Sequence, residues 1–315
     1  MNILTLFSLN GEDSATVNAD GRFTMIPAAA FDVNRQAASI DVILGWGSAA
    51  SQILNRTNRV RFIQAMSAGV DYLPLRQLAQ EHILLANTSG IHAEPIAEHV
   101  LGSVLTFARG LRPTAPLTEA QWLDNARREA IWTAAGKTVL IYGTGHIGQA
   151  IAKLLRGIGM HTIGISRTGA AKPEFDRVGT DADSTNFARV ADVIVNVMPL
   201  TGETRHFFDA RFFTALPQKP LFINVGRGAS VDQKALVAAL QAGRLRGAAL
   251  DVFEVEPLPT NDPLWRLPNV LITPHLSGTV PNLRHQVFEI FWPNLLSIAK
   301  GGPLVKNQVD LSLGY

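Results

Sequence analysis

Short apolar runs alternate with segments of helical spacing through the first third of the chain. Three runs rich in β-branched residues predict buried strands: residues 40–46, 60–66 and 83–87. Residues 1–7 predict a further strand at the start, and residues 74–81 have helical spacing. Runs with apolar residues on both faces of the strand are typical of parallel sheets covered by helices. This part of the chain therefore predicts one α/β unit.

The same alternation continues over a longer stretch. A mostly apolar segment predicts a buried helix over about residues 94–111, and a final helix is predicted over about residues 280–298. Between them, six apolar runs predict the strands of a second sheet, at residues 139–142, 161–166, 191–197, 221–225 and 248–253 and in a run that starts at residue 270. The polar tail from residue 303 is predicted to return to the first unit.

Length, composition and charge narrow the class of protein. A single hydrophobic core rarely grows beyond about 250–300 residues, so the 315 residues of this chain favour two domains. Hydrophobic residues make up 47% of the chain and charged residues 17%, which is typical of a globular protein with a large core. The formal net charge is only +2, and the Lys and Arg residues are scattered, so we expect no nucleic-acid partner.

The absence of cysteine excludes disulfides and thiol catalysis, and we assign no metal site. No apolar run approaches the ~18 residues that would span a bilayer. The first residues also lack the basic segment and the cleavage site of a signal peptide. We therefore expect a cytoplasmic protein without a membrane partner.

Three glycines follow the strand at residues 139–142 in the pattern G-x-G-x-x-G and lead into a helical segment. Gly143 permits a tight turn, Gly145 lets the backbone approach a pyrophosphate, and Gly148 allows the helix to pack closely on the strand. The N–H groups and the dipole at the start of the helix favour the phosphate charge. In this context the motif predicts a dinucleotide site; a glycine-rich turn without a ligand is the alternative.

The end of the next predicted strand indicates which dinucleotide binds. NAD-specific folds usually place an acidic residue about 20 residues beyond the glycines, whereas an arginine accommodates the 2′-phosphate of NADP. Here Arg167 stands 19 residues beyond Gly148, between Ser166 and Thr168. A guanidinium flanked by hydroxyls suits a phosphate. We predict NADP(H), with NAD(H) as the alternative; an exposed arginine without a ligand is the other interpretation.

Charged residues also follow later strands, at the strand ends where ligands bind in open α/β sheets. Arg227 stands between two glycines and could bind a carboxylate through two hydrogen bonds; a structural salt bridge is the alternative. His275 and Glu256 suit an imidazole that is oriented by a carboxylate and acts as a general acid and base. A histidine alone is more often packed or on the surface, so the combination with Arg227 indicates catalysis. Residues 67–71 of the first unit are either a ligand loop or a plain turn.

Together these stretches resemble the D-isomer-specific 2-hydroxyacid dehydrogenases over nearly the whole chain. The matching stretches are residues 67–71, 97–99, 143–150, 191–201, 224–228, 250–253, 256–257 and 273–275. The resemblance implies an α/β fold with two Rossmann-like, doubly wound parallel-sheet domains. A flavodoxin-like substrate domain would contain residues 1–96 and 286–315, and an inserted NAD(P)-binding Rossmann domain would contain residues 97–285. It also implies a homodimer that forms through the Rossmann domain.

The resemblance implies roles for individual residues. Arg227 would bind the carboxylate of a 2-oxoacid and polarise its keto oxygen, His275 would protonate that oxygen, and Glu256 would hold His275. The backbone of residues 67–69 would complete a substrate-binding set of Ser67, Ala68, Gly69 and Arg227. The implied cofactor-binding set is Gly143, Gly145, His146, Ile147, Gly148, Ser166, Arg167, Thr168, Met198, Pro199, Thr204, Val225, Gly226, Asp251 and Ser277.

The family resemblance and Arg167 together predict the NADPH-preferring reduction of a small 2-oxoacid to a D-2-hydroxyacid. One alternative is an NADH-dependent D-2-hydroxyacid dehydrogenase. Another is a dinucleotide-sensing binding protein similar to the corepressor relatives of the family, although the intact catalytic trio favours turnover. The substrate stays open among glyoxylate, hydroxypyruvate, pyruvate and branched or aromatic 2-oxoacids, because one methylene changes selectivity by only ~1–3 kcal/mol.

Overall fold

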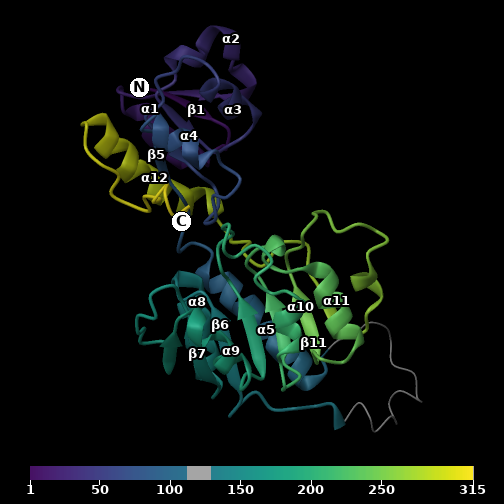
Figure 1. The fold of residues 1–315 in the computed structure, drawn as a ribbon. Helices are drawn as coiled ribbons and strands as arrows, with labels where there is room; N and C mark the ends of the chain where they lie inside the picture. The colour runs from purple at the N-terminus through teal and green to yellow at the C-terminus, as the bar shows by residue number, and fades with distance from the viewer. Residues whose placement is uncertain (112–128, 315) are drawn as a thin grey trace. The chain divides into compact units, whose positions relative to one another are not determined.

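The computed structural model describes residues 1–111 and 129–314, and the chain divides into two compact units. The first unit comprises Met1–His92 and Val280–Tyr315, and the second comprises Ala93–Thr279. Figure 1 shows that each unit is a sheet with helices packed around it. Every pairing between the described strands of the two sheets is parallel, which confirms the predicted fold class.

The first unit is built on a five-stranded sheet in the order β2-β1-β3-β4-β5. This is the strand order of flavodoxin-like domains. The strands are β1 (Asn2–Thr5), β2 (Thr24–Pro27), β3 (Val42–Leu44), β4 (Phe62–Gln64) and β5 (Leu84–Ala86). The helices are α1 (Gly11–Ala19), α2 (Val33–Gln36), α3 (Ser48–Leu54), α4 (Leu75–Gln80) and α12 (Leu283–Ala299).

Different helices cover the two faces of this sheet, because successive residues of a strand point to opposite faces. Leu4 and Ile43 belong to a core that includes residues of α3 and α4. Ile3 and Val42 belong to a second core with α12, which Figure 1 shows in yellow beside the N-terminal elements. The end of the chain therefore completes the first unit.

The tail after α12 lies along the edge of the same sheet. Ala86 of β5 forms an antiparallel bridge with Gln308, and the N–H of Val309 donates to the carbonyl of Leu85 (2.9 Å). The predicted return of the tail to the first unit is confirmed.

The second unit has a seven-stranded sheet in the order β12-β11-β10-β9-β6-β7-β8. Its first six strands in chain order have the Rossmann arrangement, with the switch point between β6 and β9. The strands are β6 (Thr138–Tyr142), β7 (His161–Ile165), β8 (Arg177–Gly179), β9 (Val193–Asn196), β10 (Leu221–Asn224), β11 (Gly247–Leu250) and β12 (Val270–Ile272). The helices are α5 (Ala93–Arg109), α8 (His146–Gly157), α9 (Ser184–Ala188), α10 (Ala210–Thr214) and α11 (Gln233–Gln241).

Alternation along β6 again divides the core into two layers. Val139 and Ile141 pack with residues of α5 and α8, whereas Leu140 and Tyr142 pack with residues of α10 and α11. Every residue of β9 and β10 is buried, as expected for strands that are covered on both faces. The loops that contain Met198 and Arg227 follow the carboxyl ends of these two buried strands.

Two edge strands lie outside the predicted set. β2 (Thr24–Pro27) and β8 (Arg177–Gly179) are short, partly exposed and mixed in polarity. Each begins with a polar or charged residue, Thr24 in β2 and Arg177 in β8, as is possible where a strand has a neighbour on one side only. The hydrophobic pattern therefore misses these two, although it detects β5 and β12 at the opposite edges, which are apolar throughout.

Among the described helices, none combines the length and the apolar character that crossing a bilayer requires.

Candidate functional site

The glycine-rich turn between β6 and α8 has the geometry that its sequence predicts. Gly143 has φ = +107°, and a Cβ built on Gly148 would lie 1.9 Å from the carbonyl oxygen of Gly143. Both positions therefore require glycine for reasons within the protein. By contrast, no described atom lies within 4 Å of a Cβ built on Gly145. No contact within the described protein requires glycine at position 145. The open space over the Gly145 backbone fits the approach of a pyrophosphate.

Gly145 also occupies the N-cap position of α8, a helix of 12 residues that begins with His146 and Ile147. Because glycine has no side chain, it leaves the N-terminal end of the helix accessible to an anion. The helix dipole adds a favourable potential for negative charge at the same place. The turn and the helix start together could hold the phosphates of a dinucleotide.

The end of β7 lies next to this turn. The N–H of Gly143 donates to the carbonyl of Ile165 (2.9 Å), so the residues after Ile165 leave the sheet beside the glycines. Ser166 closes the following turn by accepting a hydrogen bond from Gly169 N at its Oγ (3.2 Å). Arg167 is exposed.

The loop after β9 is held by local hydrogen bonds. Thr204 Oγ1 donates to the carbonyl of Pro199 (2.7 Å) and accepts from Thr201 N (2.8 Å). The N–H of Met198 donates to Asn196 Oδ1 (3.1 Å). The predicted cofactor residues Met198, Pro199 and Thr204 thus belong to one ordered segment at the carboxyl end of β9.

Arg227 lies directly after β10, between two glycines that pack against the neighbouring strand ends. A Cβ on Gly226 would lie 3.1 Å from Nδ2 of Asn196, the last residue of β9. A Cβ on Gly228 would lie 1.9 Å from the carbonyl carbon of Phe253, beyond β11. These contacts fix the main chain on both sides of Arg227, whose Nη1 donates to the carbonyl of Gly226 (2.9 Å).

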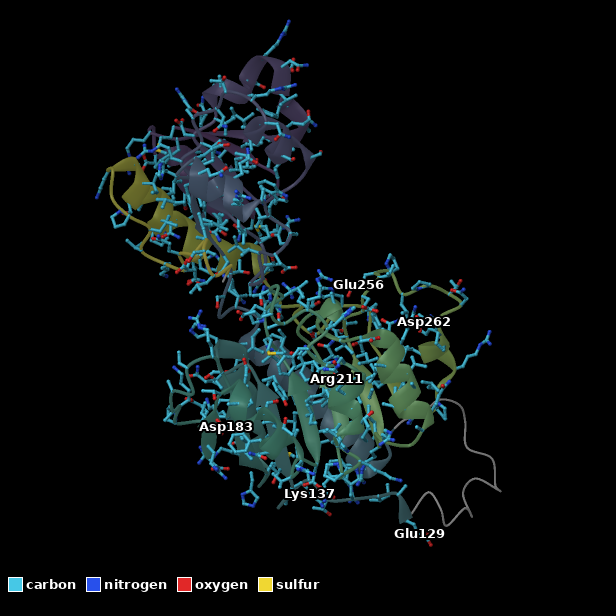
Figure 2. The ribbon with its side chains drawn as sticks, in the orientation of Figure 1. Glu129, Lys137, Asp183, Arg211, Glu256 and Asp262 are labelled. Atoms are coloured by element: carbon cyan, nitrogen blue, oxygen red, sulfur yellow. The ribbon has the colours of Figure 1, made fainter. Side chains whose placement is uncertain are left out.

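His275 and Glu256 form a hydrogen-bonded pair. His275 Nδ1 lies 2.7 Å from Glu256 Oε2, and Glu256 Oε1 accepts from Phe253 N (2.9 Å). Since a carboxylate can only accept, the proton of this bond is on Nδ1, which leaves Nε2 for another partner. The His275 side chain is 55% exposed and can therefore reach a ligand. Figure 2 shows Glu256 and Lys137 at opposite ends of the second unit, as expected because Lys137 precedes β6 and Glu256 follows β11.

Asp251 organises the backbone around His275. Its buried carboxylate accepts hydrogen bonds from Thr273 Oγ1 (2.5 Å), Leu276 N (3.0 Å) and Ser277 N (3.0 Å). Burial raises the pKa of Asp251, but the hydrogen bonds from Ser277, Thr273 and the backbone outweigh it and lower the pKa overall. His275 itself has φ = +53° and donates its N–H to the carbonyl of Asp251 (2.9 Å). The charged carboxylate thus stabilises a tight turn that presents the imidazole.

Sequence reasoning missed several residues that support this site. Asn196 and Asn224 are register partners at the ends of β9 and β10, and Asn196 Nδ2 donates to Asn224 Oδ1 (2.9 Å) and Ser230 Oγ (2.7 Å). His99 Nε2 of α5 lies 3.4 Å from Thr273 Oγ1. An asparagine at the end of each of two otherwise apolar strands was the available signal, because a buried amide needs partners.

The predicted carboxylate segment lies in the first unit, after β4. Ser67 Oγ donates to the carbonyl of Gly69 (2.7 Å) and lies 3.0 Å from the Tyr72 hydroxyl. The carbonyl of Ala68 accepts from Asn87 Nδ2 (2.8 Å). Tyr72 also lines a cavity of about 430 Å³ together with Trp46, Ser51, Leu54, Asn55, Leu73, Pro74 and Gln77.

Three of the predicted residues are thus connected within the second unit. Gly228, next to Arg227, packs on Phe253; Phe253 binds Glu256; and Glu256 binds His275. The predicted substrate residues 67–69 belong to the other unit. Among the described residues, no group of three or more His, Asp or Glu side chains is placed to hold a metal ion.

Comparisons with known proteins agree with this arrangement. Residues 101–277 match the family model described as "D-isomer specific 2-hydroxyacid dehydrogenase, NAD binding domain". The chain is 32% identical to a glyoxylate/hydroxypyruvate reductase B from Citrobacter koseri over 277 residues, which is 87% of this chain and 85% of the relative.

Solved structures are similar over almost the whole length. A D-isomer specific 2-hydroxyacid dehydrogenase family protein from Aeromonas salmonicida has 31% identity and a TM-score of 0.81, with 98% of this chain and 99% of that chain covered. An NADPH-dependent glyoxylate/hydroxypyruvate reductase from Sinorhizobium meliloti, solved with NADP and sulfate, has 26% identity and a TM-score of 0.80, with 100% and 99% covered.

Proposed function

The chain belongs to the D-isomer-specific 2-hydroxyacid dehydrogenase family and is therefore an oxidoreductase; from this premise, we propose that it reduces a small 2-oxoacid to a D-2-hydroxyacid with NADPH as the preferred donor. The observation that carries the proposal is the hydrogen bond between His275 Nδ1 and Glu256 Oε2 (2.7 Å), on the same sheet edge as Arg227. This bond leaves Nε2 of an exposed imidazole available for the substrate, and Arg227 follows a strand that ends at the same edge of the sheet.

Arg227, His275 and Glu256 have different roles in the proposed reduction. Arg227 binds the substrate carboxylate through its planar fork and polarises the keto oxygen. His275, protonated before the reaction, donates the Nε2 proton to that oxygen as it gains negative charge. Glu256 stabilises the imidazolium and keeps Nε2 directed at the substrate, because Oε2 holds Nδ1 and Oε1 is fixed by Phe253 N.

The nicotinamide ring supplies the hydride when the cofactor is bound. The residues of this chain fit such a group: the backbone at Gly145 is open, and the N-terminus of α8 favours phosphate. Met198, Pro199 and Thr204 would flank the adenosine side of the cofactor, and Val225, Gly226 and Ser277, which follow β10 and β12, would complete its site. Asp251 and Ser277 shape the turn that carries His275.

Arg167 supports NADPH over NADH. It is exposed directly after β7, next to Ser166 and Thr168, where the 2′-phosphate of the adenosine ribose would lie. The Sinorhizobium meliloti enzyme, which is described as NADPH-dependent, supports the same preference.

We further propose that the first unit is the substrate domain and contributes the backbone of Ser67, Ala68 and Gly69 to carboxylate binding. A homodimer through the second unit and a cytoplasmic location also stay predictions. Light scattering of the purified protein tests the predicted homodimer, because a monomer at micromolar concentration would contradict it.

The test of the function is an assay of nicotinamide absorbance with NADPH and NADH against glyoxylate, hydroxypyruvate, pyruvate, 2-oxoisocaproate and phenylpyruvate. Turnover with NADPH preferred supports the proposal. The order of kcat/KM among the five acids then indicates the size of the pocket that holds the substrate side chain. No turnover with any acid, while a cofactor still binds, would favour the dinucleotide-sensing alternative.

A further inference from the structure

A buried polar network joins the ends of β9 and β10. It consists of Asn196, Asn224 and Ser230, and none of these side chains is more than 1% exposed. Asn196 Nδ2 donates to Asn224 Oδ1 (2.9 Å) and to Ser230 Oγ (2.7 Å). Asn224 Nδ2 (3.1 Å) and Ser230 Oγ (2.6 Å) both donate to the carbonyl of Arg227.

Backbone groups fix the direction of every bond in this network. Met198 N donates to Asn196 Oδ1 (3.1 Å), so the Asn196 Nδ2 group must face the other two side chains. Gly226 N donates to Asn224 Oδ1 (3.1 Å), so Asn224 Nδ2 must face Arg227. Ser230 accepts from Asn196, and its single proton is therefore available for the Arg227 carbonyl. With each polar group satisfied in one orientation, the network has one arrangement.

The network acts on a single peptide group. The carbonyl of Arg227 accepts from Asn224, from Ser230 Oγ and from Ser230 N (3.3 Å). At the other end, the same network holds Met198 N in the loop after β9. Two segments that are far apart in the sequence are thereby fixed to each other through buried side chains.

We propose that Asn196, Asn224 and Ser230 are positioning residues that fix the main chain of Arg227 relative to the Met198 segment. This inference rests on the proposed role of Arg227 in binding the substrate carboxylate. Two hydrogen bonds from one guanidinium require the Arg227 backbone to be placed accurately, and a displacement of about 1 Å can cost on the order of 100-fold in rate. The network supplies that accuracy without contacting substrate or cofactor.

The test uses Ser230→Ala and Asn224→Ala in the full chain, with Ser184→Ala as the matched control. Ser184 is also a buried serine of the second unit, and its Oγ bonds the Tyr142 hydroxyl (2.8 Å), which is not part of the network. Three quantities are measured for each variant: the Kd of NADPH, the Kd of oxamate for the NADPH-bound protein, and kcat/KM for the best 2-oxoacid. Oxamate is used because it presents the carboxylate and the carbonyl of a 2-oxoacid but is not reduced.

We expect both network variants to weaken oxamate binding and to lower kcat/KM by about 10- to 100-fold, with the Kd of NADPH and the thermal midpoint close to those of Ser184→Ala. Oxamate affinity equal to that of the control overturns the proposal, and so does an equal loss of NADPH and oxamate binding. If the wild-type protein binds oxamate but reduces no 2-oxoacid, the proposed function fails while the oxamate data still decide the role of the network. Wild-type protein that does not bind oxamate overturns the carboxylate role of Arg227 and this inference with it.

Discussion

The Cα of Gly228 lies directly against the backbone of Phe253. A Cβ built on Gly228 would stand 1.9 Å from both the carbonyl carbon and the carbonyl oxygen of Phe253. Phe253 N in turn donates to Glu256 Oε1. This contact therefore connects the loop of Arg227 with the carboxylate that orients His275, although Phe253 and Glu256 stand 26 and 29 positions after Arg227 in the sequence.

Gly228→Ala should damage both stability and activity, because the added methyl group forces the two backbones apart. We expect a loss of roughly 1–3 kcal/mol in the free energy of unfolding and a fall in kcat/KM of about 100-fold or more. Denaturant unfolding and steady-state kinetics measure the two effects. Gly157→Ala is the control, since no described atom lies within 4 Å of a Cβ there and its φ is not positive. Equal behaviour of the two variants would show that the Gly228 contact is dispensable.

His275→Gln should slow the chemical step and leave cofactor binding intact. Glutamine can keep a hydrogen bond to Glu256 but cannot deliver a proton, so kcat should fall about 10²- to 10⁴-fold. Stopped-flow reduction of the 2-oxoacid measures this step, and fluorescence titration measures the Kd of NADPH. His161→Gln, an exposed histidine at the start of β7, should behave as wild type. Retained turnover in His275→Gln would remove the assigned role of the imidazole.

The central parts of the fold and the charged site residues could be predicted from the sequence because each leaves a local signal. The buried strands β6, β9 and β10 are mainly apolar runs. Within the glycine-rich turn, Gly143 is required by its positive φ and Gly148 by its contact with Gly143. Arg227, Glu256 and His275 follow strands that end at one edge of a parallel sheet, so the topology alone brings them to that edge.

The remainder depends on contacts between residues that are distant in the sequence. The sequence around Gly228 does not indicate that Phe253 lies against it. The sequence also does not indicate that Ser230 bonds Asn196, because only the fold brings these two side chains together. The family resemblance places Asp251 in the cofactor-binding set. Its carboxylate accepts hydrogen bonds from Thr273, Leu276 and Ser277, and these partners could not be predicted because only the folded turn brings them to Asp251.

Arg167→Asp should move the cofactor preference from NADPH toward NADH. An aspartate repels the 2′-phosphate and can accept hydrogen bonds from the ribose hydroxyls of NADH. Since hydrogen bonds to charged groups contribute about 1.5–3 kcal/mol each, the ratio of kcat/KM for NADPH to that for NADH should fall by at least about tenfold. Arg189→Asp makes the same charge change at another exposed arginine of the second unit and should leave the ratio unchanged. An unaltered preference in Arg167→Asp would refute the cofactor argument.

His285 and Asp13 should make the stability of the first unit depend on pH. His285 Nδ1 lies 3.0 Å from Asp13 Oδ1, and Asp13 is buried where α1 meets the start of α12. The hydrogen bond to Asp13 and the charge of Asp13 raise the pKa of His285, with smaller contributions from Glu289 and Glu12. A raised pKa in the folded state means that the ion pair stabilises the fold fully below the unfolded value of about 6.5 and is lost as pH rises through the folded value.

His285→Gln isolates this charge effect, because glutamine can still donate a neutral hydrogen bond to Asp13. We expect the variant to have a lower thermal midpoint than wild type at about pH 5.5 and nearly the same midpoint at about pH 9. Thermal unfolding at a series of pH values measures the difference, with His161→Gln as the control that should track wild type throughout. A difference that stays constant or grows toward high pH would mean that the pair stabilises the fold through packing or a neutral hydrogen bond, and that the ionised histidine contributes nothing to it.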